Sequence, residues 1–175
     1  MRSFIQFKKQ AGTSLLELMA YLIIALFVIS GAVALWNQVT SSSSGLALIK
    51  DVVALRSGAQ GIFVGQGNYG NGSLNASLIL FKKVPSDISQ TGGTLTASNG
   101  GVFTVTGNGS NIIVSLTGQT ADSCGALLTQ SIGWASVQVG TNAAITTFPV
   151  TPDVAGNTAN CGGTEPFTIT WTSFN

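Results

Sequence analysis

Histidine is absent from this sequence of 175 residues, and charged side chains of both signs are scarce. Without histidine, the chain lacks the most frequent general base of enzymes and the most frequent nitrogen ligand of protein-bound metals. The sequence has no Gly-x-Ser-x-Gly, phosphate-loop or EF-hand motif, and its acidic residues show no paired spacing. We therefore expect no enzyme, no cofactor and no metal site.

The few charges are also unevenly placed. Arg2, Lys8 and Lys9 lie near the N-terminus, whereas from Thr13 onward four basic side chains stand against six acidic ones. Such a body lacks the basic cluster that binds phosphate groups, so we expect no direct nucleic-acid site. Only 7% of the residues are charged but 45% are hydrophobic, which indicates a folded chain rather than a disordered one.

A long apolar run follows the N-terminal basic residues. From Leu15 to Trp36 the chain is apolar, broken mainly by Glu17, Ser30 and Gly31. In a helix this run would span about 33 Å, enough to cross the hydrocarbon core of a bilayer. The positive-inside rule then predicts a cytoplasmic N-terminus, with the remainder of the chain outside.

Two cleavage positions compete at this end. An ordinary secretory signal would end at Ala34 and release a soluble protein that begins at Leu35. The alternative is a cut between Gly12 and Thr13, which retains the apolar run. Glu17 favours the second cut, because a carboxylate near the bilayer centre costs a few kcal/mol and gives an ordinary signal no benefit.

A retained Glu17 needs a partner. After the cut it is the fifth residue of the mature chain, and in a staggered array it would meet the new α-amino group of Thr13 on another subunit. At about 4 Å and an effective dielectric constant of about 20, the pair attracts by about 4 kcal/mol before desolvation. We therefore expect Glu17 to recruit a neighbouring subunit and set its register.

These residues together resemble the leader and mature N-terminus of type IV prepilins. The resemblance rests on the basic residues, Gly12 before the cut, Glu17 at mature position five and the apolar run; it is local to residues 8–36 and architectural elsewhere. It implies cleavage after Gly12 by a prepilin peptidase, N-methylation of Thr13 and polymerisation with the pilus assembly machinery. The subunit would reside in the inner membrane as a prepilin and then in an extracellular filament.

The twelve-residue leader and a first mature residue other than Phe, Thr13, look more like the type IVb branch, so the leading interpretation is a type IVb major pilin that polymerises with itself. The alternatives are a minor pilin or a type II secretion pseudopilin and, from another class, a secreted binding protein whose signal ends at Ala34. Filaments of this family serve in adhesion, bundling, conjugation and motility.

Cysteine occurs only twice, at Cys124 and Cys161. Two cysteines without histidine are too few for a metal site, whereas an exported protein commonly forms disulfides. A bond between them would be worth roughly 4 kcal/mol in the chain-entropy description. Two buried free thiols are the alternative. The pair also resembles the disulfide-bounded region of type IV pilins, here residues 124–161.

The fold expected is α+β, with a long N-terminal helix over residues 13–64 packed on an antiparallel sheet in a head of residues 65–175. Residues 13–36 are the expected transmembrane and assembly part, and the helix continues as an amphipathic stripe of Leu48, Val52, Leu55, Ala59 and Ile62. Two helices with a linker at 40–45 are the alternative.

The head is expected to hold a sheet of about four strands. The predicted elements are a loop at 65–73, a short helix or irregular segment at 74–81, a hairpin of 101–106 and 111–117 around a turn at 107–110, a helix from 122 to about 132, and strands at 134–139, 144–148 and 166–174.

Overall fold

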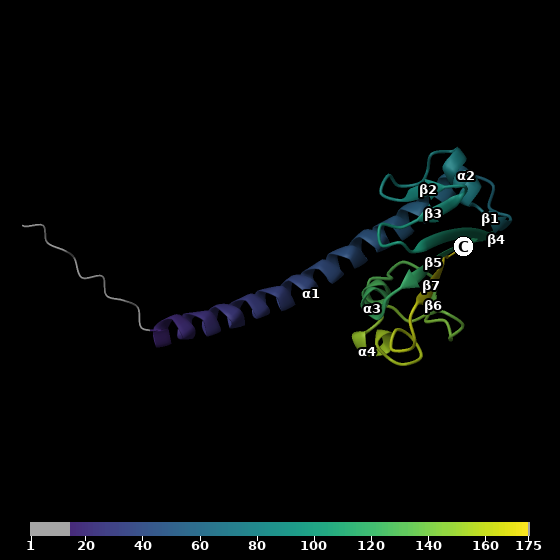
Figure 1. Ribbon diagram of the computed structural model, residues 1–175. Helices are drawn as coiled ribbons and strands as arrows, with labels where there is room; N and C mark the ends of the chain where they lie inside the picture. Colours follow the sequence, from purple (N-terminus) through teal and green to yellow (C-terminus); the bar gives the residue numbers. More distant parts are fainter. Residues whose placement is uncertain (1–14, 175) are drawn as a thin grey trace, which may run out of the picture. The chain divides into compact units, whose positions relative to one another are not determined.

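The computed structural model describes residues 15–174, with the chain forming two compact units, Met1–Val39 and Thr40–Asn175. The predicted leader, residues 1–12, and Thr13 lie outside the described residues. Helix α1 (Leu15–Ile62) runs without interruption through residues 40–45 (Figure 1). The single-helix prediction is therefore confirmed. Serine and glycine in this stretch cost at most about 1 kcal/mol each relative to alanine, too little to end a helix by themselves.

Within the part of the chain that the structure describes, no helix is both long enough and apolar enough to cross a membrane.

The second unit is built around one antiparallel sheet. Its strand order is β2-β3-β4-β5-β7-β6, with β1 paired to β4 off this path. The elements that follow α1 are β1 (Asn71–Ser73), α2 (Asn75–Leu80), β2 (Ser89–Thr91), β3 (Thr94–Thr96), β4 (Val102–Asn108), β5 (Asn111–Gln119), α3 (Ala121–Thr129), β6 (Ser136–Val139), α4 (Pro152–Ala155) and β7 (Phe167–Thr172). The expected helix-plus-antiparallel-sheet architecture is confirmed, although the sheet has seven strands rather than about four.

The C-terminal half of α1 belongs to the core of this unit. Its predicted stripe is buried, with Leu48, Val52, Leu55 and Ala59 fully inaccessible to solvent and Ile62 partly buried against the same core. The sheet contributes alternate residues: in β7 the apolar side chains are buried and the threonines between them are partly exposed. Apolar residues therefore recur about every 3.6 residues in the helix and every second residue in the strand, so that one helix stripe packs against one face of the sheet.

The hairpin of β4 and β5 differs from the prediction at its turn. Gly107 and Asn108 were expected in the turn, but they pair with Ile112 and Asn111 as the last residues of the ladder. The turn is therefore only two residues long and begins with Gly109, whose φ is +60°. Glycine readily adopts this φ, and a glycine at the first turn position suits a tight hairpin.

Strand β1 lies in a stretch predicted as a loop. It pairs with β4 over three residues, and Gly72 stands opposite Gly107. A Cβ atom at Gly107 would collide with the Tyr69 carbonyl group, whose carbon would be 2.8 Å away, whereas a Cβ at Gly72 would meet nothing within 4 Å. Only glycine at position 107 therefore allows the chain before β1 to approach β4 so closely.

The strand predicted at 144–148 is wrong. Only Ile145 pairs, through two backbone hydrogen bonds with Val137. Pro149 follows this segment and has no N–H to donate to a ladder. The helix predicted from 122 to about 132 is α3, which ends earlier, at Thr129.

Candidate functional site

The residues predicted to direct processing and assembly lie at the start of α1 or before it. Gly12 and Thr13 are outside the described residues. Glu17 lies in α1, close to the start of the residues that the structure describes. The pairing of Glu17 with a neighbouring subunit remains a prediction.

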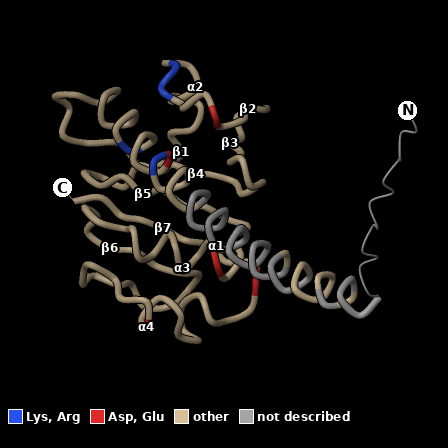
Figure 2. The backbone as a smooth tube through the Cα atoms, turned by 90° about the vertical axis from the view of Figure 1, so that its left-hand side faces the viewer, with Lys and Arg blue, Asp and Glu red and all other residues tan. Residues whose placement is uncertain are grey.

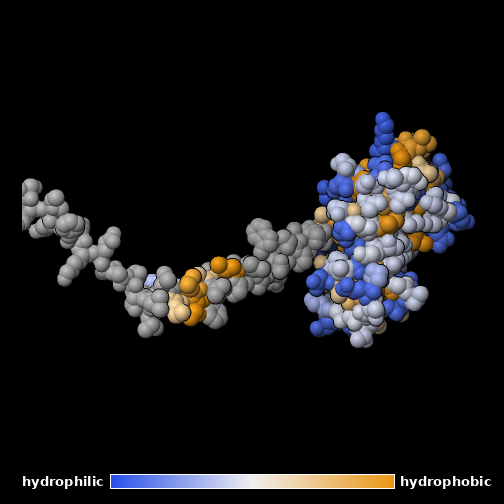
Figure 3. Space-filling view, in the orientation of Figure 1, coloured by the Kyte–Doolittle hydropathy of each residue, from blue (hydrophilic) through white to orange (hydrophobic). Residues whose placement is uncertain are grey.

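The first unit of the chain presents apolar side chains to solvent. Six large ones in α1 are between 55% and 63% exposed, and the orange atoms on this helix in Figure 3 include such residues. They are Met19, Tyr21, Leu22, Ile23, Ile24 and Ile29. Because adjacent residues point to different sides of a helix, the run from Tyr21 to Ile24 exposes apolar groups around most of the helix. A helix that is apolar all round is expected to be covered by lipid or by other protein.

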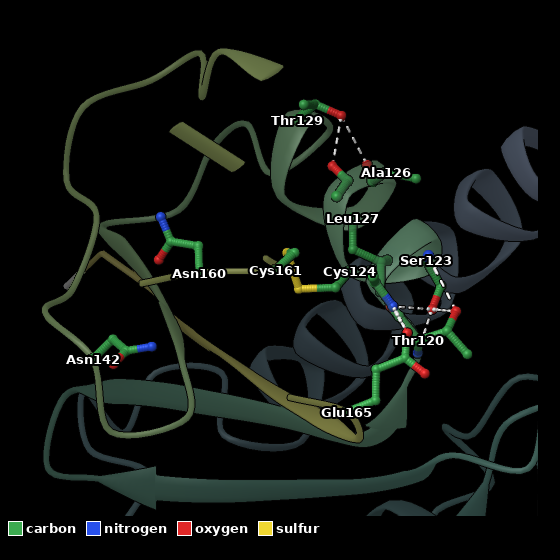
Figure 4. The surroundings of a disulfide bond; sticks show 12 residues. Thr120, Ser123, Cys124, Ala126, Leu127, Thr129, Asn142, Asn160, Cys161 and Glu165 are labelled. Carbon is green, nitrogen blue, oxygen red and sulfur yellow. Dashed lines mark hydrogen bonds between the residues drawn. A yellow bond between two sulfur atoms is a disulfide. The ribbon is translucent and has the colours of Figure 1, made fainter. Parts of the chain in front are cut away.

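The two cysteines are joined in the second unit. Cys124 on α3 and Cys161 form a disulfide with a Cα–Cα distance of 5.7 Å, and both residues are buried (Figure 4). The disulfide expected from the sequence is therefore present, and it ties α3 to the segment before β7. It closes 37 residues of chain that contain β6 and α4.

Two further features stabilise the N-terminus of α3, and the second of them ties it to the segment before β7. Thr120 and Ser123 form a capping box, in which the Ser123 N–H donates to Thr120 Oγ1 at 3.4 Å and the Thr120 N–H donates to Ser123 Oγ at 3.0 Å. Glu165 accepts a hydrogen bond from the Ala121 N–H at 2.5 Å (Figure 4). The carboxylate thus satisfies a free donor at the N-terminus of the helix and adds a second tie beside the disulfide. The cysteine pair is predictable from the sequence, whereas no sequence pattern signals the contact of Glu165 with α3.

The charged groups of the second unit are few and dispersed over its backbone (Figure 2). Arg56 serves a structural purpose: its Nη1 donates to the Gly133 carbonyl at 2.6 Å, and its guanidinium lies 4.8 Å from the Trp134 ring centre. Both contacts join α1 to the segment after α3. A guanidinium over an aromatic face adds an electrostatic attraction to the packing.

A buried carboxyl group lies on the same helix. Asp51 is only 2% exposed, and its Oδ1 has no hydrogen-bond partner within the described residues. The pKa of Asp51 is raised to about 6: burial contributes most, the charge of Asp87 and a hydrogen bond to it act in the same direction, and Lys50 opposes them. Two carboxyl groups that share a hydrogen bond favour the state with one proton between them.

Comparison with known proteins assigns the chain to a protein family and finds a solved structure with a similar fold. The family model described as PilS N terminal matches residues 42–174. The chain belongs to the PilS N-terminal family. Among solved structures it is similar to the crystal structure of TcpA, a type IV pilin from Vibrio cholerae El Tor biotype, with 14% sequence identity and a TM-score of 0.54, covering 77% of this chain and 99% of that chain. No curated protein matches the sequence.

The resemblance to type IV pilins is thereby confirmed. This PilS-family chain has the type IV pilin fold, and the family and the fold together indicate a structural pilin subunit. The family match covers the second unit, whereas the residues that first suggested the resemblance, 8–36, lie ahead of it. Two separate parts of the chain therefore point to the same kind of protein.

Proposed function

We propose that this chain is the major subunit of a type IV pilus of the type IVb branch, and that it polymerises through the N-terminal half of α1. The observation that carries the proposal is the exposed apolar surface of that half, from Met19 to Ile29, attached to a unit with the pilin fold. Exposing such a surface to water is unfavourable. We therefore expect the inner membrane to cover it first and the helices of other subunits to cover it in the filament.

The proposal includes a processing step. A prepilin peptidase removes residues 1–12, the new N-terminus at Thr13 is methylated, and the assembly machinery moves the subunit from the inner membrane into an extracellular filament. Glu17 then pairs with the Thr13 amine of a neighbour. The pairing explains a carboxylate in an apolar run, since it replaces an unpaired charge in a low-dielectric environment by an ion pair.

Two parts of the proposal, the assignment to type IVb and the assignment as a major rather than a minor pilin, rest on separate features. The proposed N-terminal residue Thr13, which is not Phe, favours type IVb, and the likeness to TcpA concerns the fold alone. A major subunit makes up most of the mass of purified filaments, whereas a minor pilin or a pseudopilin does not. Adhesion, bundling, conjugation and motility are the roles open to such a filament.

Mass spectrometry of the mature N-terminus tests the proposal. The full chain is expressed in cells that have the pilus machinery, and surface filaments are sheared and purified. We expect a chain that begins at methylated Thr13 and dominates the filament fraction. A soluble chain that begins at Leu35 would contradict the proposal and support a secreted binding protein instead.

A further inference from the structure

A polar cavity lies beside the disulfide in the second unit. Its volume is about 310 Å³, and its walls come from three segments: the end of β6 with the turn after it, residues 139–142; the chain around Cys161; and residues 163–168, which lead into β7. Figure 4 shows Asn142 and Asn160 on the side of the disulfide away from α3. The volume is at the lower end of the range for small-ligand sites, which suits one ring rather than a long chain.

The lining excludes several ligand classes. None of the residues that line the cavity is Lys, Arg, Asp or Glu, so it offers no charge to an anion or a cation. Glu165 lies between two lining residues in sequence, but its carboxylate accepts the α3 hydrogen bond. An apolar ligand is equally disfavoured, because six lining side chains are polar: Thr141, Asn142, Thr158, Asn160, Thr164 and Thr168. The remaining class is a neutral ligand rich in hydrogen-bonding groups.

Two carboxamides line this cavity, Asn160 buried and Asn142 exposed, and both keep unused hydrogen-bonding capacity. Asn160 is 6% exposed and its Nδ2 donates to the Val154 carbonyl at 2.7 Å, while Nδ2 of Asn142 donates to the Ala159 carbonyl. Each carboxamide retains one N–H and its Oδ1, for which residues 15–174 supply no hydrogen-bond partner. An adjacent donor and acceptor fit two neighbouring hydroxyl groups, because a hydroxyl both donates and accepts.

The threonines extend the same pattern. Of the threonines that line the cavity, Thr141, Thr158 and Thr164 are exposed to solvent and Thr168 is half-buried, so their hydroxyls are accessible to a ligand. The backbone beneath them is fixed, since the Gly140 N–H donates to the Thr168 carbonyl at 2.7 Å and the disulfide anchors the neighbouring wall. Preorganised walls reduce the entropy that a ligand loses on binding.

We propose that this cavity binds a neutral sugar ring, either as a free monosaccharide or as the terminal residue of a glycan. A sugar ring carries several hydroxyls at adjacent carbons, which match the paired donors and acceptors of Asn142 and Asn160 and the accessible hydroxyls around them. The inference goes beyond polymerisation and does not depend on it, because the cavity is contained within one subunit.

The test uses the full chain in a detergent without a sugar headgroup, since an alkyl glycoside would compete. Individual monosaccharides (glucose, galactose, mannose and N-acetylglucosamine) are titrated while the side-chain amide signals of Asn142 and Asn160 are followed by NMR. We expect saturable shifts with at least one neutral sugar, with a dissociation constant on the order of 1 mM for about 12 non-hydrogen atoms. Glucuronate, which carries a charge, should bind more weakly than glucose if glucose binds.

The test variant is the double substitution Thr164→Val and Thr168→Val, and the matched control is Thr104→Val. All three replace a hydroxyl by a methyl group of similar size, and Thr104 is an exposed residue of β4 outside the cavity. We expect the double variant to weaken binding by about tenfold or more and the control to leave it unchanged, because each lost hydrogen bond is worth a factor of a few.

Absence of saturable shifts with every sugar, or equal binding by the double variant, would overturn the inference. A second arm presents glycans through an array: binding only to arrays assigns a terminal glycan residue, and binding of free sugars assigns a monosaccharide. Filament formation is scored separately by electron microscopy, so failure to bind sugar leaves the proposed pilus function standing. Normal binding without filaments would count against the pilus function alone.

Discussion

The bond between Cys124 and Cys161 allows the most quantitative prediction. The two cysteines are 37 residues apart. In the chain-entropy description, a closed loop of that length lowers the entropy of the unfolded state by an amount worth about 4 kcal/mol at 25 °C. For a unit of this size, about 4 kcal/mol corresponds to a fall of roughly 14 °C in the midpoint of thermal unfolding.

The assay is denaturant unfolding of the full chain with and without a reductant, together with Cys124→Ala, Cys161→Ala and the double variant. Either single substitution already removes the bond. The double variant should therefore lose little more than either single one, rather than the sum of both. The mature N-terminus should be the same in all variants, because the bond is remote from the cut in sequence.

The contact between Glu165 and α3 allows a comparison of the stability lost with one hydrogen bond and the stability lost with the disulfide. A single hydrogen bond to a charged group contributes about 1.5–3 kcal/mol, so Glu165→Gln should cost less than loss of the disulfide. Unfolding curves that coincide under oxidising and reducing conditions would refute the reasoning, as would single substitutions whose effects add up in the double variant.

Three further predictions concern α1 and the sheet. Gly12→Ala should block processing, whereas Glu17→Ala should be processed and fold but form no filaments; normal pili from the Glu17 variant, seen by electron microscopy, would contradict the pairing. Stability should fall as pH rises from about 4 to about 7, because folded Asp51, with a pKa of about 6, holds its proton better than the unfolded residue. Asp51→Asn should flatten this fall by up to about 3 kcal/mol in unfolding titrations, and an unchanged pH profile would refute the role of the carboxyl. Gly107→Ala should destabilise by about 2 kcal/mol or more and Gly72→Ala by less than 1, so equal denaturation midpoints would show that the close approach is unimportant.

The parts of the fold that the sequence predicted are those with a sustained period. The stripe from Leu48 to Ile62 repeats over four helical turns, and the alternation in Phe167–Thr172 extends over a whole strand. Each pattern is long enough to distinguish a helix from a strand. The leader motif is also local in the chain, but residues 1–12 lie outside the described residues and the motif stays a prediction.

The missed elements are short or depend on partners far away in the sequence. Strands β1, β2 and β3 have three residues each, too few to show an alternation. They form through pairing: β1 and β3 pair with β4, and β2 pairs with β3. The cavity could not be predicted from the sequence either, since its walls come from separate segments between residues 139 and 168. The raised pKa of Asp51 likewise depends on burial and on Asp87, and both act on this carboxyl group only after folding.

The central claim is that the N-terminal half of α1 assembles subunits, with Glu17 of one chain neutralised by the terminal amine of the next. A filament reconstruction at side-chain resolution tests it most directly. The account predicts bundled α1 helices in the filament core and a Glu17 carboxylate within about 4 Å of the Thr13 nitrogen of a neighbour, the separation at which the pair attracts strongly. A filament whose Glu17 side chains face solvent or remain unpaired would contradict it.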